Sequence, residues 1–214
     1  VVVVRPIDRH GSRALVTDLM LMAGEAAARF CSEKGLPIPY ATQPAPEQIQ
    51  HPEGMAGMYA YRRQFKPSRT STEPGAHFGL GLDAYARATS PLRRYADLLV
   101  HQQIRSLLRG EEPASAERIS ARAGEADQSG IAVRRTERQS NQHWKLVYLQ
   151  QNKAWKGEAV VVELGERKTT IMIPELALES KVRVKQDLAL DQRVGTSVVE
   201  VDLPDLDGRF RVNA

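Results

Sequence analysis

Cysteine and long apolar runs are nearly missing from this sequence, and both absences restrict what the protein can be. Its 214 residues include a single cysteine, Cys31, so no disulfide can form within the chain. No apolar run approaches the ~20 residues that a membrane-spanning helix needs. The purest one, Val1–Val4, also lacks the charged start and the cleavage site of a signal peptide. We therefore predict a cytoplasmic protein with no membrane partner.

The start of the sequence also lacks a methionine. We expect that further sequence precedes Val1, and that Val1–Val4 is a buried strand whose neighbours lie in that part. Cys31 falls on the apolar side of a predicted helix, with no suitably placed base. A core residue is therefore expected there rather than a nucleophile.

What the sequence does hold is an ordinary globular composition with a basic excess. Hydrophobic residues make up 42% and charged residues 26%, and the formal net charge is +4. The basic residues cluster at Arg62–Arg63, Arg93–Arg94 and Arg134–Arg135, with Tyr59 and Tyr95 nearby. Guanidinium groups bind phosphates and aromatic faces stack on bases, so these clusters favour a nucleic-acid partner. A solvated surface is the alternative for any one pair.

The first predicted helix begins at Ser12, a good N-cap, and ends before Gly35. Its first half is apolar nearly all round, which predicts a buried helix. Asp18 lies in that half. Because a carboxylate is costly to bury without a partner, Asp18 is either one end of an internal salt bridge or a site carboxylate.

The clearest element is a helix with Ser90 as its N-cap and Pro91 in its first position. Arg93 and Arg94 then fall in the first turn, where cations face the positive end of the helix dipole. A bound anion would remove this conflict, because free amides at a helix start and two guanidinium groups bind phosphate. The segment 89–95 is therefore predicted to be a phosphate-clamping helix start.

Two polar residues, Asp97 and His101, follow Arg93 one and two turns later. They either orient Arg93 from behind or form a surface ladder. Farther on, 113–153 has the pattern of a polar helix with a break or kink near Gly124 and 129–130. Its charged face consists of Arg134, Arg135, Glu137 and Arg138. A solvated helix explains that face almost as well as nucleic-acid contact does.

The last part of the chain changes to strand patterns. Five short strands are predicted, at 157–164, 169–173, 182–184, 192–201 and 209–212. Five strands in about sixty residues suit an OB-type barrel, a common nucleic-acid fold. The aspartates Asp202, Asp205 and Asp207 do not have the spacing of a calcium loop, and we expect a hairpin turn there.

One segment carries a family resemblance. It contains His77-Phe78-Gly79-Leu80, then Tyr85, then Thr89-Ser90-Pro91-Leu92-Arg93-Arg94-Tyr95-Ala96-Asp97, and then His101. It resembles the ribonuclease II and ribonuclease R catalytic (RNB) domain. That family has a His-Phe-Gly-Leu segment, a Tyr, a Thr-Ser-Pro-Ile-Arg-Arg-Tyr-x-Asp helix start and a following His. Val16-Thr17-Asp18-Leu19-Met20 looks like the family's Val-x-Glu-x-Met helix, and the tail is similar to its S1 domain.

The resemblance covers nearly the whole chain, most weakly at 36–70, and it implies an α+β fold in two parts. Residues 1–154 would be the C-terminal portion of an RNB domain, mainly helical with an N-terminal strand. Residues 155–214 would be a five-stranded S1-like OB barrel that binds RNA. The implied activity is processive 3′-to-5′ hydrolysis of single-stranded RNA to nucleoside 5′-monophosphates with Mg²⁺.

The resemblance also implies roles for individual residues. Arg93 would contact the phosphates near the 3′ end, and Asp18 would replace the family's glutamate near the terminal ribose. Asp97 and His101 would support the site. The other expected RNA contacts are His77, Tyr85, Thr89, Ser90, Arg94, Tyr95, Glu137 and Arg138.

The sequence departs from the family pattern at several positions. Asp18 is one methylene shorter than glutamate, and Gly24 stands where the family usually has Asn. Arg87 and Ala88 stand where many members have His and Phe. The family's aspartate-rich metal motif lies upstream of the Val-x-Glu-x-Met helix, but here seventeen residues precede Asp18 and no Asp-Asp pair occurs.

We therefore expect no metal site in this segment. The Mg²⁺ ligands would lie in an upstream half of the same enzyme, and this segment alone would not hydrolyse RNA. The alternative is a non-catalytic RNA-binding module derived from the same fold, and a structural protein that reuses the fold is a third interpretation. Four clustered aspartates in the upstream sequence would favour the enzyme.

Overall fold

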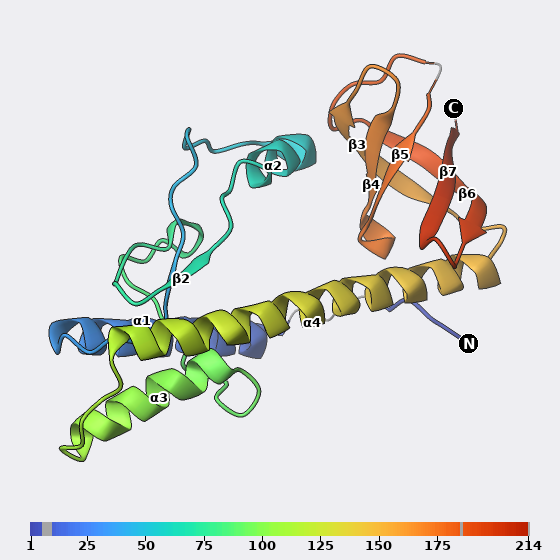
Figure 1. Ribbon diagram of the computed structural model, residues 1–214. Coiled ribbons are helices and arrows are strands. Elements are labelled where there is room, and N and C mark those ends of the chain that lie inside the picture. Colours follow the sequence, from blue (N-terminus) through green and yellow to red (C-terminus); the bar gives the residue numbers. More distant parts are fainter. Residues whose placement is uncertain (6–9, 185, 214) are drawn as a thin grey trace. The chain divides into compact units, whose positions relative to one another are not determined.

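The computed structural model describes residues 1–5, 10–184 and 186–213 (Figure 1). By backbone contacts these residues form two compact units. We call residues 10–49 and 65–133 the helical unit, and residues 1–5, 50–64 and 134–213 the barrel unit. The long helix α4 (Ala116–Gln151) gives its first half to the helical unit and its second half to the barrel unit. None of the helices in the described part of the chain is long and apolar enough to cross a membrane.

The helical unit is built on α1 (Gly11–Glu33), α3 (Tyr95–Leu108) and the start of α4. A short antiparallel ribbon accompanies them, formed by β1 (Tyr40–Thr42) and β2 (Arg69–Ser71), and a 3₁₀ turn, η1, spans Phe78–Leu80. The C-terminal half of α1 packs on β1, on the segment before α3 and on α3 itself. This core consists of Ala28, Cys31, Leu36, Ile38, Tyr40, Ala86 and Val100. A second, smaller cluster joins α3 to α4 and contains Leu99, Ile119 and Ala123.

Cys31 is a core residue, as predicted. Its side chain is fully buried and forms no disulfide. Burial raises the pKa of the thiol to about 11, so it is protonated at neutral pH. A buried, protonated thiol does not act as a nucleophile.

The barrel unit contains a five-stranded antiparallel sheet with the strand order β5-β4-β3-β6-β7 (Figure 1). Its strands are β3 (Lys156–Leu164), β4 (Thr169–Ile173), β5 (Leu178–Val182), β6 (Arg193–Asp202) and β7 (Asp207–Asn213), with a 3₁₀ turn, η2, at Pro174–Leu176. The sheet curls into a nearly closed barrel whose interior is filled by alternating apolar residues. Leu146 and Leu149 of α4 are fully buried in that core. The OB-type barrel predicted from the strand pattern is therefore confirmed.

The observed strand limits agree with the predicted ones for some strands and differ for others. The first two strands match their predicted ranges within one residue, but the third lies earlier than predicted, at Leu178–Val182. The expected hairpin turn joins β6 to β7: Asp202 pairs with Asp207, and Asp202 Oδ1 accepts a hydrogen bond from the Asp205 amide at 3.1 Å. The aspartates there close a turn, as predicted.

The helix α2 (Gly54–Arg62) belongs to the barrel unit and is attached to it by polar contacts near both ends. Near its start, Asp191 Oδ1 accepts a hydrogen bond from the Ala56 amide at 2.8 Å, which is a capping contact supplied by the loop before β6. Gly54, with a φ of +73°, lies against that carboxylate and leaves no space for a Cβ. Just after the helix, Arg63 forms an ion pair with Glu163 of β3.

Three sequence predictions about the N-terminal segment and the helices are wrong. Residues 1–5 form no strand, and Val1, Val3 and Val4 are exposed, because no described strand lies beside them. The first half of α1 is exposed rather than buried: Leu15, Val16, Leu19 and Met22 each leave more than half of their surface free. The predicted break near Gly124 and 129–130 is absent, because α4 runs without interruption through both positions.

Candidate RNA-contact site

A tight turn precedes α3. The Ser90 carbonyl accepts hydrogen bonds from the amides of Arg93 and Arg94, at 3.2 and 3.0 Å. Arg94 is the N-cap, in extended conformation with φ −127° and ψ 114°, and the helix begins at Tyr95. The predicted start at Pro91 is therefore wrong, and Arg93 lies before the helix rather than in its first turn. The conflict between Arg93 and the helix dipole consequently does not arise.

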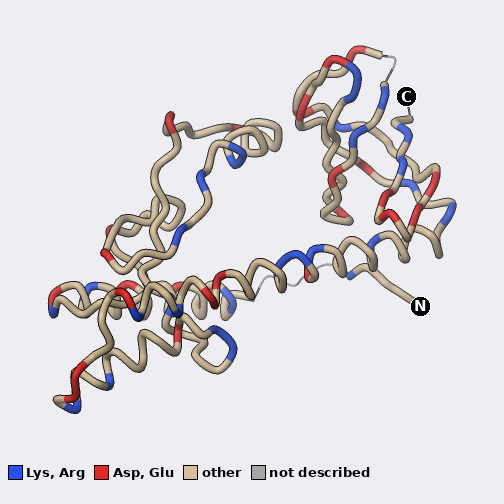
Figure 2. The backbone as a smooth tube through the Cα atoms, in the orientation of Figure 1, with Lys and Arg blue, Asp and Glu red and all other residues tan. Residues whose placement is uncertain are grey.

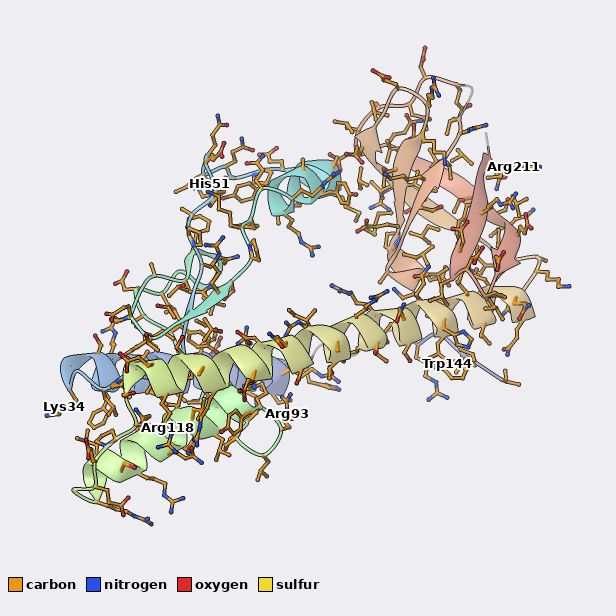
Figure 3. All side chains as sticks on the ribbon, in the orientation of Figure 1. Lys34, His51, Arg93, Arg118, Trp144 and Arg211 are labelled. Carbon is orange, nitrogen blue, oxygen red and sulfur yellow. The ribbon has the colours of Figure 1, made fainter. Side chains whose placement is uncertain are left out.

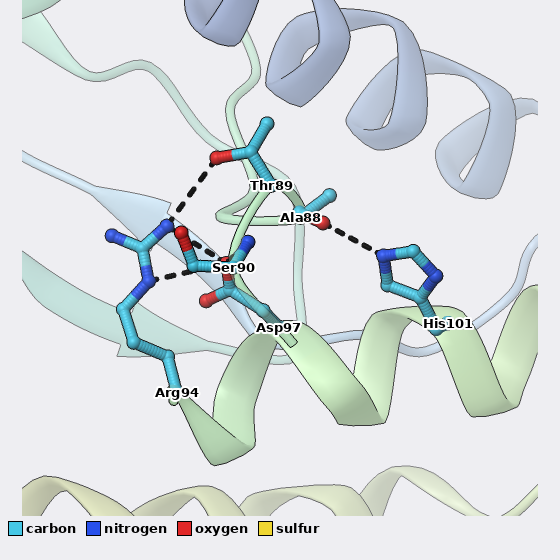
Figure 4. A network of polar contacts seen from close by, with 6 residues as sticks. All are labelled: Ala88, Thr89, Ser90, Arg94, Asp97 and His101. Atoms are coloured by element: carbon cyan, nitrogen blue, oxygen red, sulfur yellow. Dashed lines mark hydrogen bonds and ion pairs between the residues drawn. The ribbon is translucent and has the colours of Figure 1, made fainter. Parts of the chain in front are cut away.

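Asp97 anchors this turn from within the helix (Figure 4). Its side chain is fully buried, and its Oδ2 accepts hydrogen bonds from the Ser90 amide at 2.8 Å and from the Arg94 guanidinium at 3.1 Å and 2.8 Å. A buried carboxylate is stable only with such partners. Asp97 therefore fixes the beginning and the end of the turn. It is not part of a surface ladder, and its partner is Arg94 rather than Arg93.

Two further polar contacts position the segment before the turn and the helix after it. His101 Nε2 lies 2.7 Å from the Ala88 carbonyl oxygen (Figure 4). Gln103 is 2% exposed, and its amide group bonds the Pro37 carbonyl and both backbone groups of Ala114. The sequence prediction missed Gln103, because its position in the helix shows no sign of the three backbone groups that it contacts.

Arg93 is left free by this arrangement. Its side chain is exposed on the turn before α3 (Figure 3), and it forms no hydrogen bond or ion pair with any residue that the structure describes. Its neighbours Leu92 and Tyr95 also face outward, with exposed fractions of 102% and 42%. The rigid turn therefore presents an unpaired guanidinium, which is the group best suited to bind a phosphate in two places.

Asp18 lies in the exposed first half of α1. Its carboxylate has no hydrogen-bond or ion-pair partner among the described residues, so the internal salt bridge offered as an alternative is absent there. Around it, Leu15, Val16, Leu19 and Met22 form an exposed apolar stripe at helical spacing. The structure therefore shows a free carboxylate on an apolar helix surface.

His77 and Tyr85 lie in the segment between β2 and α3. Their rings meet edge to face, with centroids 6.1 Å apart. His77 Nδ1 is buried and has no hydrogen-bond partner, and burial lowers the pKa of the ring below its usual value of 6.5. His77 is therefore neutral at pH 7 and does not attract phosphate by charge.

The position of Tyr85 also explains why residue 24 is a glycine, where the family that the sequence resembles usually has Asn. Gly24 of α1 lies so close to the 85–86 segment that a Cβ there would fall 2.3 Å from Tyr85 Cε2 and 2.6 Å from the Ala86 carbonyl oxygen. The Gly24 carbonyl also accepts a hydrogen bond from the Ala86 amide at 3.3 Å. No side chain fits where α1 meets the 85–86 segment, so an Asn is excluded.

We predict that Gly24→Ala lowers the free energy of unfolding by about 1–3 kcal/mol, because the new methyl group overlaps a backbone oxygen that cannot move freely. The matched control is Gly124→Ala in α4, where a Cβ meets nothing within 4 Å. Alanine is the better helix former, so that variant should be more stable by roughly 0.5–1 kcal/mol. Urea unfolding of both variants tests the pair, and equal effects of the same sign would refute the close approach at Gly24.

Glu137 and Arg138 lie in the barrel unit, on a fully exposed stretch of α4. Arg93, Asp18, His77 and Tyr85 lie in the helical unit. Neither Glu137 nor Arg138 has an ion-pair partner among the described residues. The structure thus brings together Thr89, Ser90, Arg94, Asp97 and His101 in one network, and it leaves Arg93, Asp18, Glu137 and Arg138 as free surface groups.

The described residues do not fit a metal centre. They contain no group of three or more histidine, cysteine, aspartate or glutamate side chains that could hold an ion. The buried carboxylate of Asp97 has one oxygen without a partner, but a single carboxylate does not make a magnesium site.

Comparison with known proteins gives two family matches. Residues 55–110 match the RNB domain, and residues 155–213 match the RNase II-type exonuclease C-terminal S1 domain. An uncharacterised ribonuclease from Synechocystis is 35% identical over 210 residues, which cover 94% of this chain and 32% of that protein. The chloroplastic and mitochondrial ribonuclease II of Arabidopsis thaliana is 28% identical over 196 residues, which cover 87% of this chain and 24% of that protein.

A solved structure shows the same fold. RNase R from Mycoplasma genitalium, in complex with ribose-methylated single-stranded RNA, matches with a TM-score of 0.77 and 15% identity, over 99% of this chain and 45% of that one. At that identity the likeness shows the fold alone. The chain spans about a third or less of the length of the two curated relatives above.

Proposed function

Because this chain belongs to the ribonuclease II and ribonuclease R (RNB) family of exoribonucleases, we propose that it forms part of an enzyme that degrades single-stranded RNA processively from the 3′ end and releases nucleoside 5′-monophosphates. The observation that carries the proposal is the turn at 90–94. Asp97 holds this turn rigidly, and Arg93 extends from it with no partner among the described residues. A fixed, free guanidinium is a ready site for a phosphodiester.

In this proposal, Arg93 binds phosphate oxygens near the 3′ end and stabilises the charge that develops on them during hydrolysis. Charged donors that are already in position contribute most to such stabilisation, because little reorganisation is needed in the reaction. The Asp97–Arg94 ion pair supplies this preorganisation by fixing the backbone on both sides of Arg93. Arg94 is already paired with Asp97 in this structural role. Of the two adjacent arginines, Arg93 is therefore the one proposed to bind phosphate.

Asp18 is proposed to accept a hydrogen bond from the terminal ribose, where a 2′-hydroxyl distinguishes RNA from DNA. Its carboxylate is exposed and has no partner among the described residues, so it is available for this contact. The exposed apolar stripe around it (Leu15, Val16, Leu19 and Met22) would be covered by the upstream half of the same enzyme. The small share of the relatives' length that this chain spans supports a longer enzyme, in which we place that half upstream.

The magnesium ions of the proposed reaction would be bound by that upstream half, because the described residues do not fit them. When bound, such ions activate water and stabilise negative charge on the phosphate. The part played by this chain's own residues is to bind and orient the RNA. Arg93 would do so at the phosphates and Asp18 at the ribose.

The experiment compares the intact protein with residues 1–214 on a 5′-labelled oligouridylate in the presence of Mg²⁺. We expect stepwise shortening from the 3′ end by the intact protein and no cleavage by residues 1–214, although both should bind the oligonucleotide. Cleavage by residues 1–214 alone would refute the division of labour. An intact protein that binds RNA without cleaving it would instead favour a non-catalytic RNA-binding module, the second candidate.

A further inference from the structure

We propose that a pocket in the helical unit binds a small aromatic carboxylate. The pocket has a volume of about 320 Å³ and lies between α1, α3 and the segment 88–89 that leads into the turn before α3. Small-molecule sites usually measure ~300–1,000 Å³, so this pocket suits a ligand of one or two rings. The inference goes beyond the proposed function and does not depend on its RNA contacts.

The walls of the pocket are apolar, and most of their side chains are short. They come from α1, from the segment before the turn and from α3, and they consist of Ala23, Ala27, Ala88, Val100 and Ile104. Val100 is fully buried and belongs to the core of the helical unit. Because three of the five side chains are alanines, the two helices border this space without filling it. An apolar ligand would be stabilised here by removing these carbon atoms from water.

Ala88 is the position where the sequence accounts for this space. The family resemblance of the segment 77–101 breaks at this residue, where many members have Phe. Ala88 packs against the core of the helical unit and also lines the pocket. A phenyl group at this position would take up part of the pocket. The departure in the sequence and the opening in the structure thus coincide, and a planar aromatic ring is the group that would fill the opening.

The rim of the pocket is positive. Arg105 of α3 is exposed there and forms no hydrogen bond or ion pair with the residues that the structure describes, and none of the lining residues is acidic. Figure 2 shows a basic position in the second half of α3 and an acidic one near its start. That acidic residue, Asp97, is paired with Arg94, and Glu25 of α1 is paired with Arg29 at 2.7 Å. A free guanidinium beside an apolar wall suits a carboxylate, which it can bind through two parallel hydrogen bonds.

The other polar groups beside the pocket disfavour a nucleotide as its ligand. Thr89 Oγ1 accepts a hydrogen bond from the Arg94 guanidinium at 3.5 Å, and His101 Nε2 lies 2.7 Å from the Ala88 carbonyl oxygen (Figure 4). Both groups are therefore engaged, and the pocket offers few hydrogen-bond partners to the polar edge of a nucleobase. Burying such an edge without partners is costly. An aromatic ring without polar substituents avoids this cost, and its carboxylate can reach the rim.

The test measures binding to the intact protein by isothermal titration calorimetry with three probes: 2-naphthoate, the uncharged 2-naphthamide and adenosine 5′-monophosphate. Arg105→Gln removes the charge at the rim. Its matched control is Arg109→Gln, which removes an exposed arginine one turn farther along the chain and outside the pocket. Ala88→Phe fills the pocket from the segment before the turn and Ala23→Leu fills it from α1, so the test stands if one of them does not fold. Circular dichroism verifies the fold of each variant.

We expect 2-naphthoate to bind with a dissociation constant on the order of 10⁻⁴ M, and the amide and the nucleotide to bind roughly tenfold more weakly. Arg105→Gln should weaken 2-naphthoate about tenfold, because a charged hydrogen bond is lost, and should change 2-naphthamide by less than about twofold. Arg109→Gln should leave both within about twofold. Ala88→Phe and Ala23→Leu should each weaken both naphthyl probes by roughly tenfold or more, because the new side chains occupy the space of the ring.

Four outcomes would overturn the proposal. Undiminished 2-naphthoate binding in both filled variants would place the ligand elsewhere, for example on the exposed stripe of α1. Equal affinities for the carboxylate and the amide would remove the role of Arg105. Nucleotide binding as tight as that of 2-naphthoate would replace the ligand class. Binding by residues 1–214 but not by the intact protein would show that the upstream half covers the pocket. None of these results involves RNA cleavage, so the proposed function is tested separately.

Discussion

The Arg93→Ala variant of the intact enzyme is expected to lower kcat on oligouridylate by on the order of 10² or more, the usual effect of removing one fixed charge-stabilising donor. The expectation follows from the geometry of the turn. Arg93 has no structural partner among the described residues, so its loss leaves no buried group unsatisfied. Folding should therefore be unaffected, and thermal unfolding of the variant should match that of the unmodified protein.

Two further variants separate a specific phosphate contact from general charge. Arg93→Lys keeps the charge but loses the two-point contact, so it should recover only part of the activity. Arg118→Ala removes an exposed arginine from the first turn of α4, in the same helical unit, and should leave kcat within about twofold. Full activity of Arg93→Ala, or an equal loss in Arg118→Ala, would show that the anion site has been placed on the wrong residue.

The barrel could be predicted from the sequence because its signals are local. Short runs rich in β-branched residues, such as Thr169–Ile173, need only their own side chains to show the strand pattern. The third strand was misplaced because its local signal is weak. Only Leu178 and Val182 are buried in it, and the three residues between them are polar or charged. A strand that contributes two side chains to the core has little apolar signature.

The start of α3 could not be predicted, because the deciding contact is not local. Ser90 and Pro91 have the residue types of a helix start, but the Ser90 amide bonds to the Asp97 carboxylate seven positions later. Proline also disfavours helical conformation at the residue before it. The capping of α2 by Asp191 belongs to the same class, since it joins positions far apart in the chain.

Burial of the N-terminal elements was overestimated. An apolar pattern shows which side chains favour burial, but it does not show which surface would cover them. The pattern of α1 correctly predicts which residues avoid water, and Ala28 and Cys31 are indeed buried. Leu15 and Leu19 have the same character and are exposed, because no described residue covers them. Only the three-dimensional structure shows that these apolar side chains are not covered by the described residues.

The second large effect is expected from Asp97→Ala, which should lower the free energy of unfolding by about 3 kcal/mol. Breaking a buried ion pair typically costs about 3–5 kcal/mol. The Asp97 side chain is 0% exposed but that of Arg94 is 31% exposed, so water screens one partner and the lower end applies. For a chain of this size the thermal midpoint should fall by roughly 6–12 °C.

A double-mutant cycle shows whether the loss belongs to the Asp97–Arg94 pair or to Asp97 alone. If the ion pair dominates, the double variant with Arg94→Ala should be less destabilised than the sum of the two single variants. If the Ser90 amide dominates, the effects should add, because that amide loses its acceptor whether or not Arg94 is present. The control, Asp83→Asn, removes the charge of an exposed carboxylate and should change the unfolding free energy by less than about 0.5 kcal/mol. An Asp97→Ala variant as stable as this control would mean that the turn holds Arg93 in place without its anchor, and the preorganisation proposed for Arg93 would lose its structural basis.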